Sequence, residues 1–305
     1  MMYRYRRYAL QQAAQDDLRF RWHSSARDDG PVFRDLTWDF AEPDQYSELV
    51  GKQKPGMMTS KAEKAFHAAV VSGDPGEMLR VAGQNPKYSN PAKAIAGLLS
   101  LETDLDRGIS LIEEVVAAEP DLKKDHFVRK YLPDAGLSVL IAAGVMVHLP
   151  LQKISLVLLV AELHQARGFV DDAVQLLEAA EPTTHIRLSL TELAYDAKQF
   201  EKVLALTEGV VNDDDVTALM LAYRGRALGD VGRTDEAISV LARTLEFTNQ
   251  DPSIRAIALV GRGIINQARG EFILAQNDFT QALMEVPDDE EARQHIQQII
   301  DGSDG

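Results

Sequence analysis

One spacing of small and large residues returns along the second half of the chain and constrains its fold more than any other feature. Counted from Gly270, small residues stand seven positions before (Gly263) and five positions after (Ala275). A large apolar residue, Phe279, stands nine positions after it. The same offsets from Gly168, Lys198 and Gly232 return three further sets: Ala161, Ala173 and Leu177; Thr191, Val203 and Thr207; Gly225, Ala237 and Leu241. The four turn residues lie 30, 34 and 38 positions apart, a periodicity typical of repeat proteins.

This spacing predicts pairs of antiparallel helices that cross closely. A small residue seven positions before the turn and another five positions after it lie at the same height on the facing helices, so the two backbones approach each other. The large residue nine positions after the turn then fills the gap towards the neighbouring pair. A glycine at the junction supplies the positive φ that ends the first helix, and Asp171 or Asp235 stands where the second helix begins and matches its dipole. Because one pair cannot bury its apolar face alone, the pairs are expected to stack.

These residues resemble the tetratricopeptide repeat (TPR), a family pattern of small, small, large apolar, small and Pro. Near the C-terminus the pattern is matched by Gly263, Ala275, Phe279, Ala282 and Pro287. The segment 91–120 matches it again with Ala96, Gly108, Ile112, Val115 and Pro120. The resemblance covers about residues 91–300 and departs from the family at the aromatic positions of the first helix, where Leu259 and Leu221 replace Trp. It implies an all-α fold, a right-handed superhelix of helix pairs (a TPR-like solenoid).

The helical repeat domain is expected to run from residue 60 to residue 300. Ser60 is the predicted N-cap of its first helix, and Glu63 completes a capping box. The segment 288–300 has acidic residues in its first turn and isoleucines along one side, so it is predicted to be a capping helix, followed by a tail at 301–305. The apolar runs 136–149 and 154–161 are predicted to form a buried pair of helices rather than a membrane hairpin, because a hairpin would bury Lys153 in the bilayer.

Residues 1–59 break the helical pattern and are expected to form a short irregular arm and linker, with a possible hairpin within 19–40. Seven Arg and four Asp give residues 1–34 a net charge of +3. Three alternatives stay open for this arm. It is a mobile or loosely docked segment, or it folds back onto the acidic body, or it docks on an acidic surface, nucleic acid or lipid headgroups. The contacts in the last case would be Tyr3, Arg4, Arg6, Arg7 and Tyr8.

The charge balance limits the class of partner. The whole chain carries a net charge of −15, so the part after residue 34 carries −18 once the +3 of the arm is removed. An acidic body repels nucleic acid and anionic membranes and favours basic partners. The N-terminus lacks the apolar core and cleavage site of a signal peptide, and no apolar run reaches the ~20 residues that a spanning helix needs. The expected location is therefore cytoplasmic, with membrane insertion and nucleic-acid binding disfavoured.

The sequence offers little that indicates catalysis. It has no cysteine, and its seven histidines form no short metal-ligand spacing. The acidic segment 212–216 lacks the alternating ligands and the glycine of a calcium loop and is predicted to be a turn between repeats. The glycines of 225–232 follow a helix and lack the Lys-Ser/Thr of a phosphate loop. We therefore expect no catalytic residue, no metal and no cofactor.

The TPR resemblance implies that the first helix of each pair lines a concave groove that holds a peptide or a partner protein. The corresponding positions in this chain are Leu158, Glu162, Gln165, Leu188, Glu192, Tyr195, Asp196, Ala222, Arg226, Asp230, Val260, Ile264 and Gln267. The groove type that clamps the carboxylate of a chaperone tail has Lys, Asn and Arg here, and this chain does not. Carboxylates beside Tyr195 and apolar patches favour a ligand with basic and apolar side chains. The alternative is that these residues are solvated charges on an unused face.

The expected function is that of a non-catalytic scaffold or adaptor that binds a peptide or partner protein in this groove. One alternative is a peripheral membrane or nucleic-acid tether that acts through the basic arm, and another is an enzyme with an unrecognised site. A further alternative is a subunit of a secretion or other multiprotein complex, because the layout also resembles the helical arrays attached to type VII secretion ATPases, although this sequence lacks an ATPase module. Self-association is compatible with each of these functions.

Overall fold

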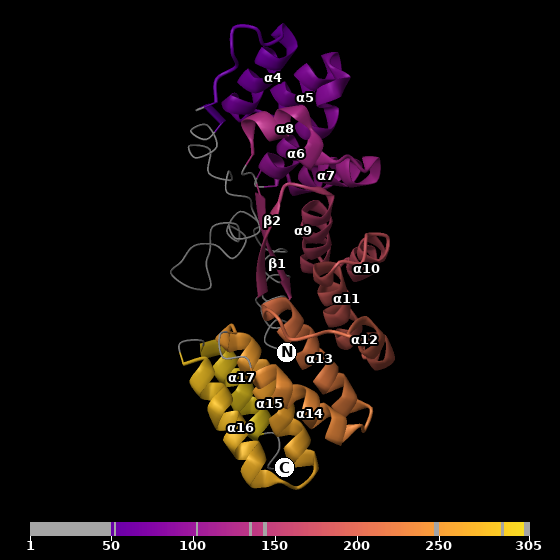
Figure 1. Cartoon of the computed structure of the whole chain (residues 1–305), viewed down its shortest axis with the longest axis vertical. Coiled ribbons are helices and arrows are strands. Elements are labelled where there is room, and N and C mark those ends of the chain that lie inside the picture. The colour runs from indigo at the N-terminus through magenta and orange to yellow at the C-terminus, as the bar shows by residue number, and fades with distance from the viewer. Residues whose placement is uncertain are drawn as a thin grey trace. The chain divides into compact units, whose positions relative to one another are not determined.

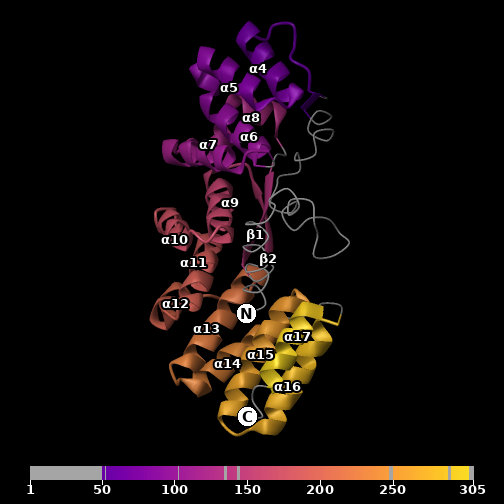
Figure 2. The same cartoon turned by 180° about the vertical axis from the view of Figure 1, so that it is seen from behind.

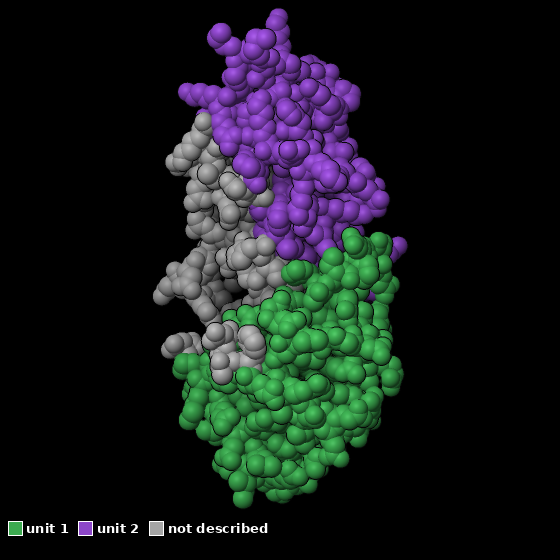
Figure 3. Space-filling model, viewed as in Figure 1, with its two compact units in different colours: residues 1–8, 141–145, 177–305 green, residues 9–140, 146–176 purple. Residues whose placement is uncertain are grey.

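The structure, a computed structural model, describes residues 50–51, 53–101, 103–133, 136–142, 145–246, 250–287 and 290–301, and most of these are helical (Figure 1). The chain divides into two compact units, which Figure 3 colours separately. The N-terminal unit comprises residues 9–140 and 146–176, and the C-terminal unit comprises residues 1–8, 141–145 and 177–305. Residues 1–49 of the predicted arm (1–59) and residues 302–305 of the predicted tail (301–305) lie outside the described residues. Within the described residues, no helix is long and apolar enough to cross a bilayer.

Helices in pairs make up most of the N-terminal unit. Its elements are α4 (Lys61–Ser72), α5 (Pro75–Gln84), η2 (Pro86–Tyr88), α6 (Ser89–Ser100), α7 (Leu105–Ala118), η3 (Leu122–Lys124), α8 (His126–Tyr131), β1 (Gly136–Ala142), β2 (Val145–Pro150), α9 (Lys153–Ala166) and α10 (Val170–Glu178), the last of which crosses the unit boundary. The predicted pair at 91–120 is present as α6 and α7. Its helices approach closely, because a Cβ on Gly97 would lie 3.1 Å from the carbonyl oxygen of Gly108.

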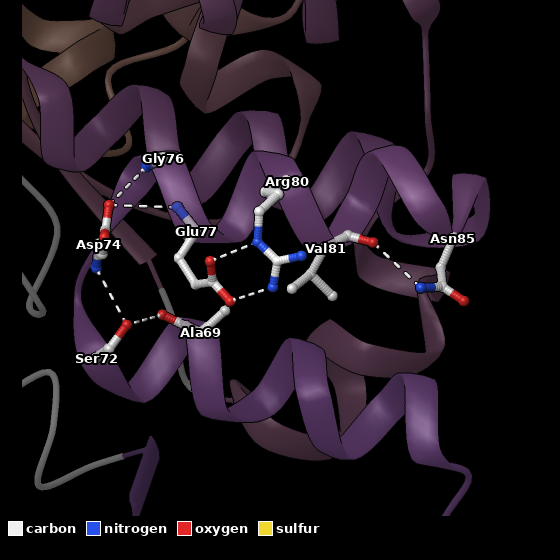
Figure 4. A network of polar contacts seen from close by, with 8 residues as sticks. All are labelled: Ala69, Ser72, Asp74, Gly76, Glu77, Arg80, Val81 and Asn85. Carbon is white, nitrogen blue, oxygen red and sulfur yellow. Dashed lines mark hydrogen bonds and ion pairs between the residues drawn. The ribbon is translucent and has the colours of Figure 1, made fainter.

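The turn between α4 and α5 shows how local polar contacts set a helix boundary (Figure 4). Asp74 is the N-cap of α5, and its Oδ1 accepts hydrogen bonds from the backbone N–H groups of Gly76 (2.8 Å) and Glu77 (3.3 Å). One turn further along, Arg80 forms a bidentate ion pair with Glu77, at 2.6 and 2.7 Å. The cap satisfies two of the N–H groups that a helix start leaves without a partner, which explains why α4 ends and α5 begins here.

The predicted capping box at the start of α4 is only half correct. Ser60 Oγ accepts from the N–H of Glu63 at 3.1 Å, as a cap should. The Glu63 carboxylate does not return to the Ser60 backbone. Instead its Oε1 accepts from Lys130 Nζ (2.7 Å) and from the Tyr131 hydroxyl (2.8 Å). Burial raises the pKa of Glu63, but these two hydrogen bonds and the positive charges of Lys130 and His126 together outweigh burial and leave the pKa below its ordinary value. The side chain therefore joins α4 to α8.

The apolar run 136–149 corrects the sequence-based prediction of a helix. It forms strands β1 and β2, which pair in a two-stranded sheet, and only the second run, 154–161, lies in a helix, α9. A Cβ on Gly136 would lie 2.9 Å from the carbonyl oxygen of Leu149, so the strands pair closely at this end. The run is rich in β-branched residues and is interrupted by Gly144, two features typical of strands. His148 therefore lies on β2 rather than in a helix.

Apart from the strand residues within 141–145, the described part of the C-terminal unit is mostly helical, and its helices follow the predicted frame. Its elements are α11 (Thr184–Asp196), α12 (Phe200–Leu206), α13 (Asp215–Asp230), α14 (Thr234–Leu245), α15 (Pro252–Ala268), α16 (Phe272–Glu285) and α17 (Glu290–Asp301). Helices α14, α15 and α16 lie side by side in both views (Figures 1 and 2). The predicted turn at 212–216 is only partly correct: residues 212–214 precede α13 with Asp214 as its N-cap, and residues 215 and 216 already lie in the helix.

The four predicted turn residues all have a positive φ: Gly168 at 84°, Lys198 at 58°, Gly232 at 81° and Gly270 at 76°. Lys198 is the informative case, because a residue with a side chain rarely adopts the left-handed region. The spacing of the repeat identified this position even though the residue is not glycine. The prediction that each pair turns at the same point is confirmed.

The close approach within each pair differs in detail from the prediction. A Cβ on Gly225 would lie 2.5 Å from Leu241 Cγ, and a Cβ on Gly263 would lie 2.7 Å from Phe279 Cε1. The residue that lies against the small position is thus the large residue of the same pair, which was predicted to face the neighbouring pair. A glycine here makes room for a large side chain between the two helices.

The predicted capping helix is present as α17. Ile296 is fully buried in a cluster with Ala256, Leu259 and Val260 of α15, and Ile299 and Ile300 pack against the same cluster. The side chains of Gln297 and Gln298 are exposed. The apolar side of α17 therefore covers α15, as the sequence pattern predicted.

Candidate functional site

The predicted groove positions all lie on the first helix of a pair, on α9, α11, α13 and α15. Their exposure divides them into three groups. The buried ones are Leu158, Glu162, Gln165, Leu188, Glu192, Ala222, Arg226 and Val260; the half-buried ones are Tyr195, Asp196, Ile264 and Gln267; and Asp230 is exposed. The residues of α9 belong to the N-terminal unit and the others to the C-terminal unit. Glu162 and Gln165 bond to each other, because Gln165 Nε2 donates to Glu162 Oε1 at 3.2 Å.

The structure brings together a polar and aromatic cluster from α11 and α13. The Tyr195 hydroxyl of α11 donates to Asp230 Oδ2 of α13 at 2.9 Å. In the opposite direction, the Tyr223 hydroxyl of α13 donates to Glu192 Oε1 of α11 at 3.0 Å. The two phenol rings lie 5.4 Å apart between centroids, at 50° to each other. We call Glu192, Tyr195, Tyr223, Arg226 and Asp230 the tyrosine–carboxylate cluster.

Arg226 supplies the positive charge of this cluster. Its guanidinium lies over the Tyr195 ring, 4.6 Å from the centroid, which is the geometry of a cation–π contact. The aliphatic part of Arg226 lies against α15, where a Cβ on Gly261 would approach Arg226 Cγ to 2.9 Å. Gly261 therefore makes the room in which the arginine side chain is held.

The pKa values of both tyrosines are raised. Burial is the main cause for Tyr195, and the Asp230 carboxylate adds to it, while the Arg226 guanidinium opposes it. Burial also places the pKa of Tyr223 well above its ordinary value, together with the charges of Glu192 and Asp196. Both phenols are therefore neutral at physiological pH and act as hydrogen-bond donors to their carboxylates. This arrangement is suited to binding a ligand and to holding α11 and α13 in a fixed arrangement.

The cluster carries an excess of negative charge. Its Glu192 and Asp230 contribute two carboxylates against the one guanidinium of Arg226, and Asp196, which lies outside the cluster, adds a third negative charge close to Tyr223. Asp230 is exposed, and Tyr195 and Asp196 are half-buried. A carboxylate offers more acceptor positions than one phenol hydroxyl occupies. A cationic group that approached Asp230 would thus find both an acceptor and the edge of an aromatic surface.

Reasoning from the sequence found four of the five members of the cluster on α11 and α13, namely Glu192, Tyr195, Arg226 and Asp230. Tyr223 and Gly261 were absent from the predicted groove, because Tyr223 faces α11 rather than an open surface and Gly261 acts through its lack of a side chain. The sequence feature that could have identified Tyr223 is that it is a second tyrosine, on the first helix of the following pair. The predicted arm contacts Tyr3, Arg4, Arg6, Arg7 and Tyr8 lie outside the described residues.

Among the residues that the structure describes, no group of three or more His, Asp or Glu side chains is arranged to hold a metal ion. No known family model matches the sequence, and no curated protein shows significant similarity to it.

Proposed function

We propose that this protein is a non-catalytic scaffold or adaptor with TPR-like stacking of its helix pairs. In this proposal the first helices bind a peptide or a segment of a partner protein in the cytoplasm, as part of a multiprotein complex. The observation that carries the proposal is the tyrosine–carboxylate cluster, which combines carboxylates from successive first helices with an aromatic surface. The cluster joins two first helices, α11 and α13, and its Asp230 carboxylate is exposed, so this carboxylate is available for recognition.

The chemistry of the cluster favours a ligand with a basic side chain. A Lys or Arg of the ligand would pair with Asp230, which is exposed, and would lie against the half-buried ring of Tyr195. The net charge of −15 would raise the local concentration of such a basic segment and speed its association. Half-buried Ile264 would provide apolar contact on α15.

A peptide-display library selected on the full chain tests this proposal. We expect the selected peptides to be enriched in Lys or Arg next to apolar residues. Asp230→Lys reverses the charge of the exposed carboxylate and should weaken binding of those peptides by about tenfold or more, since a lost ion pair becomes a repulsion. Glu246→Lys makes the same charge change at the exposed residue that follows α14, outside the cluster, and is the matched control. Selection of acidic peptides, or equal binding by both variants, would contradict the proposal.

The second candidate is the tether that acts through the basic arm, and the +3 charge of residues 1–34 is the observation that favours it. Removing residues 1–49 separates the two candidates, because it removes the basic arm and keeps the sequence of every helix from α4 to α17. Retained binding of the selected peptides supports recognition by the first helices. Loss of that binding, with unchanged helicity, supports the arm.

A further inference from the structure

The outward face of α16 carries no charge. Its large apolar residues are strongly exposed: Phe272 by 66%, Ile273 by 78%, Leu274 by 51% and Met284 by 71%. Its other exposed residues are all uncharged: Gln276, Asn277, Thr280 and Gln281. Ile273, Asn277, Thr280 and Met284 follow helical spacing, so they form one ridge about 18 Å long. We call this surface the neutral face of α16.

The two carboxylates of α16 point away from this face and are neutralised by the neighbouring helix. Asp278 is buried and pairs with Arg262 of α15 at 2.6 Å. Glu285 pairs with Arg255 of α15 at 2.8 Å. The outward face is therefore neutral because the only acidic residues of the helix lie on its inner side.

Other pairs carry acidic residues at the positions of Ile273 and Met284, all three of them at the first position and one at the second. Three positions after the turn residue, Asp171, Glu201 and Asp235 are exposed where α16 has Ile273. Fourteen positions after the turn, α14 is followed by the exposed Glu246 where α16 has Met284. The same place in the repeat is thus acidic three times and apolar once. The stability of a helix pair does not require an apolar residue there, because the other pairs do without one.

We propose that the neutral face of α16 is the surface through which two copies of this chain associate. A chain with a net charge of −15 repels a second copy wherever carboxylates meet. A twofold contact places the same patch on both sides, and an uncharged apolar ridge is complementary to itself, whereas an acidic face is not. The ridge is smaller than a standard interface of about 800 Å² per partner, so the association is weak and depends on concentration.

This inference concerns another face of the C-terminal unit than the peptide-binding proposal and stands or falls independently of it. Sedimentation velocity of the full chain, from about 5 to about 500 µM, measures it directly. We expect the average mass to rise from monomer towards dimer over this range. Higher salt should strengthen the association, because salt screens the repulsion between the acidic bodies.

The variant Ile273→Glu with Met284→Glu places on α16 the acidic residue type that all three other pairs have at the position of Ile273, and that the pair α13 and α14 has at the position of Met284, so it should fold normally. We expect it to weaken the dimer at least tenfold. The matched control, Gln175→Glu with Ser239→Glu, adds the same charge at exposed positions of α10 and α14, and should dimerise nearly as well as the unaltered chain. A chain that stays monomeric at the highest concentration would overturn the proposal. So would a dimer that both variants leave intact, or one that both disrupt equally.

Discussion

Two neighbouring helix pairs of the C-terminal unit occupy the same repeat positions with different residues. In α13 and α14, Gly225 lies against Leu241, with a Cβ position only 2.5 Å from Leu241 Cγ. In α11 and α12 the corresponding residues are Thr191 and Thr207, both buried. Each threonine hydroxyl donates to the carbonyl of the residue four positions earlier, at 2.7 Å. The repeat spacing therefore specifies which positions are buried between the two helices. Either a glycine with a leucine or two threonines can occupy these positions.

The difference shows what the repeat requires. A glycine opposite a large side chain gives one tight contact. Two threonines instead fill the space with side chains of similar size, and each hydroxyl donates a hydrogen bond within its own helix. Each arrangement is adapted to its own pair, so exchanging residues between the pairs should be costly in one direction and mild in the other.

The largest effect is expected for Gly225→Thr, which transfers the residue of α11 into α13. Because Leu241 is fully buried and cannot move away, the new side chain should destabilise the protein by about 3 kcal/mol. The reverse change, Thr191→Gly, should cost about 1 kcal/mol through lost packing and helix propensity. Urea denaturation measures both. Equal losses in the two variants would mean that the tight contact is absent.

A smaller loss is expected for Ala275→Leu, at the small position five residues after the turn. Ala275 is 3% exposed on α16, so the larger side chain should overpack the pair and cost about 2 kcal/mol. Gln276→Leu at the exposed neighbouring position is the control and should change the free energy of unfolding by less than about 0.5 kcal/mol. An unchanged melting temperature for Ala275→Leu would remove this position from the frame.

The tyrosine–carboxylate cluster gives a prediction with a pH dependence. Tyr223→Phe removes a hydrogen bond to buried Glu192 and should cost about 1–2 kcal/mol at neutral pH. The pKa of Tyr223 is raised in the folded state, so the unfolded chain loses its proton first as the pH rises through about 10. The stability that comes from the neutral phenol is full below that pH and is lost above it. The midpoint of urea denaturation should fall as the pH rises from about 8 to about 11, and it should fall less steeply in Tyr223→Phe than in the unaltered chain. Parallel curves for the two proteins would contradict this assignment.

The smallest effects concern the turns. Lys198 has a φ of 58° where Gly232 has a φ of 81°. Lys198→Gly should stabilise the protein by about 0.5–1 kcal/mol by relieving the strain of a left-handed residue, and Gly232→Lys should destabilise it by about 1 kcal/mol. Thermal unfolding of the two variants checks the pair. Shifts of the same sign would show that the two turns are not equivalent.

The sequence predicted the helix pairs well because their boundaries depend on local requirements. A small residue, a turn residue and a large residue at fixed offsets located α13 to α16, and even the lysine in the turn at 198 obeyed the offsets. The run 136–149 was predicted wrongly, because a short apolar segment has the same composition in a buried helix and in a strand. Its pairing as β1 and β2 depends on a partner segment, and no local rule specifies that partner.

The candidate site was predictable as a set of helix faces but not as a network. The repeat placed Glu192, Tyr195 and Asp230 on first helices, and their mutual arrangement needed Tyr223 from the next helix. The sequence could not show that Leu158 and Leu188 are fully buried, because exposure depends on which elements cover a face. Glu63 is a second example, because its carboxylate accepts hydrogen bonds from Lys130 and Tyr131 instead of completing the predicted capping box.

A double-mutant cycle on Gly225 and Leu241 tests most directly whether a small residue before the turn packs against the large residue after it. Gly225→Ala alone should cost about 2 kcal/mol, and Leu241→Ala alone about 3 kcal/mol. Combined, the added methyl group enters the space that the leucine leaves, so the double variant should be more stable than the sum of the single losses by more than about 1 kcal/mol. Additive losses would contradict the packing on which this account of the fold rests.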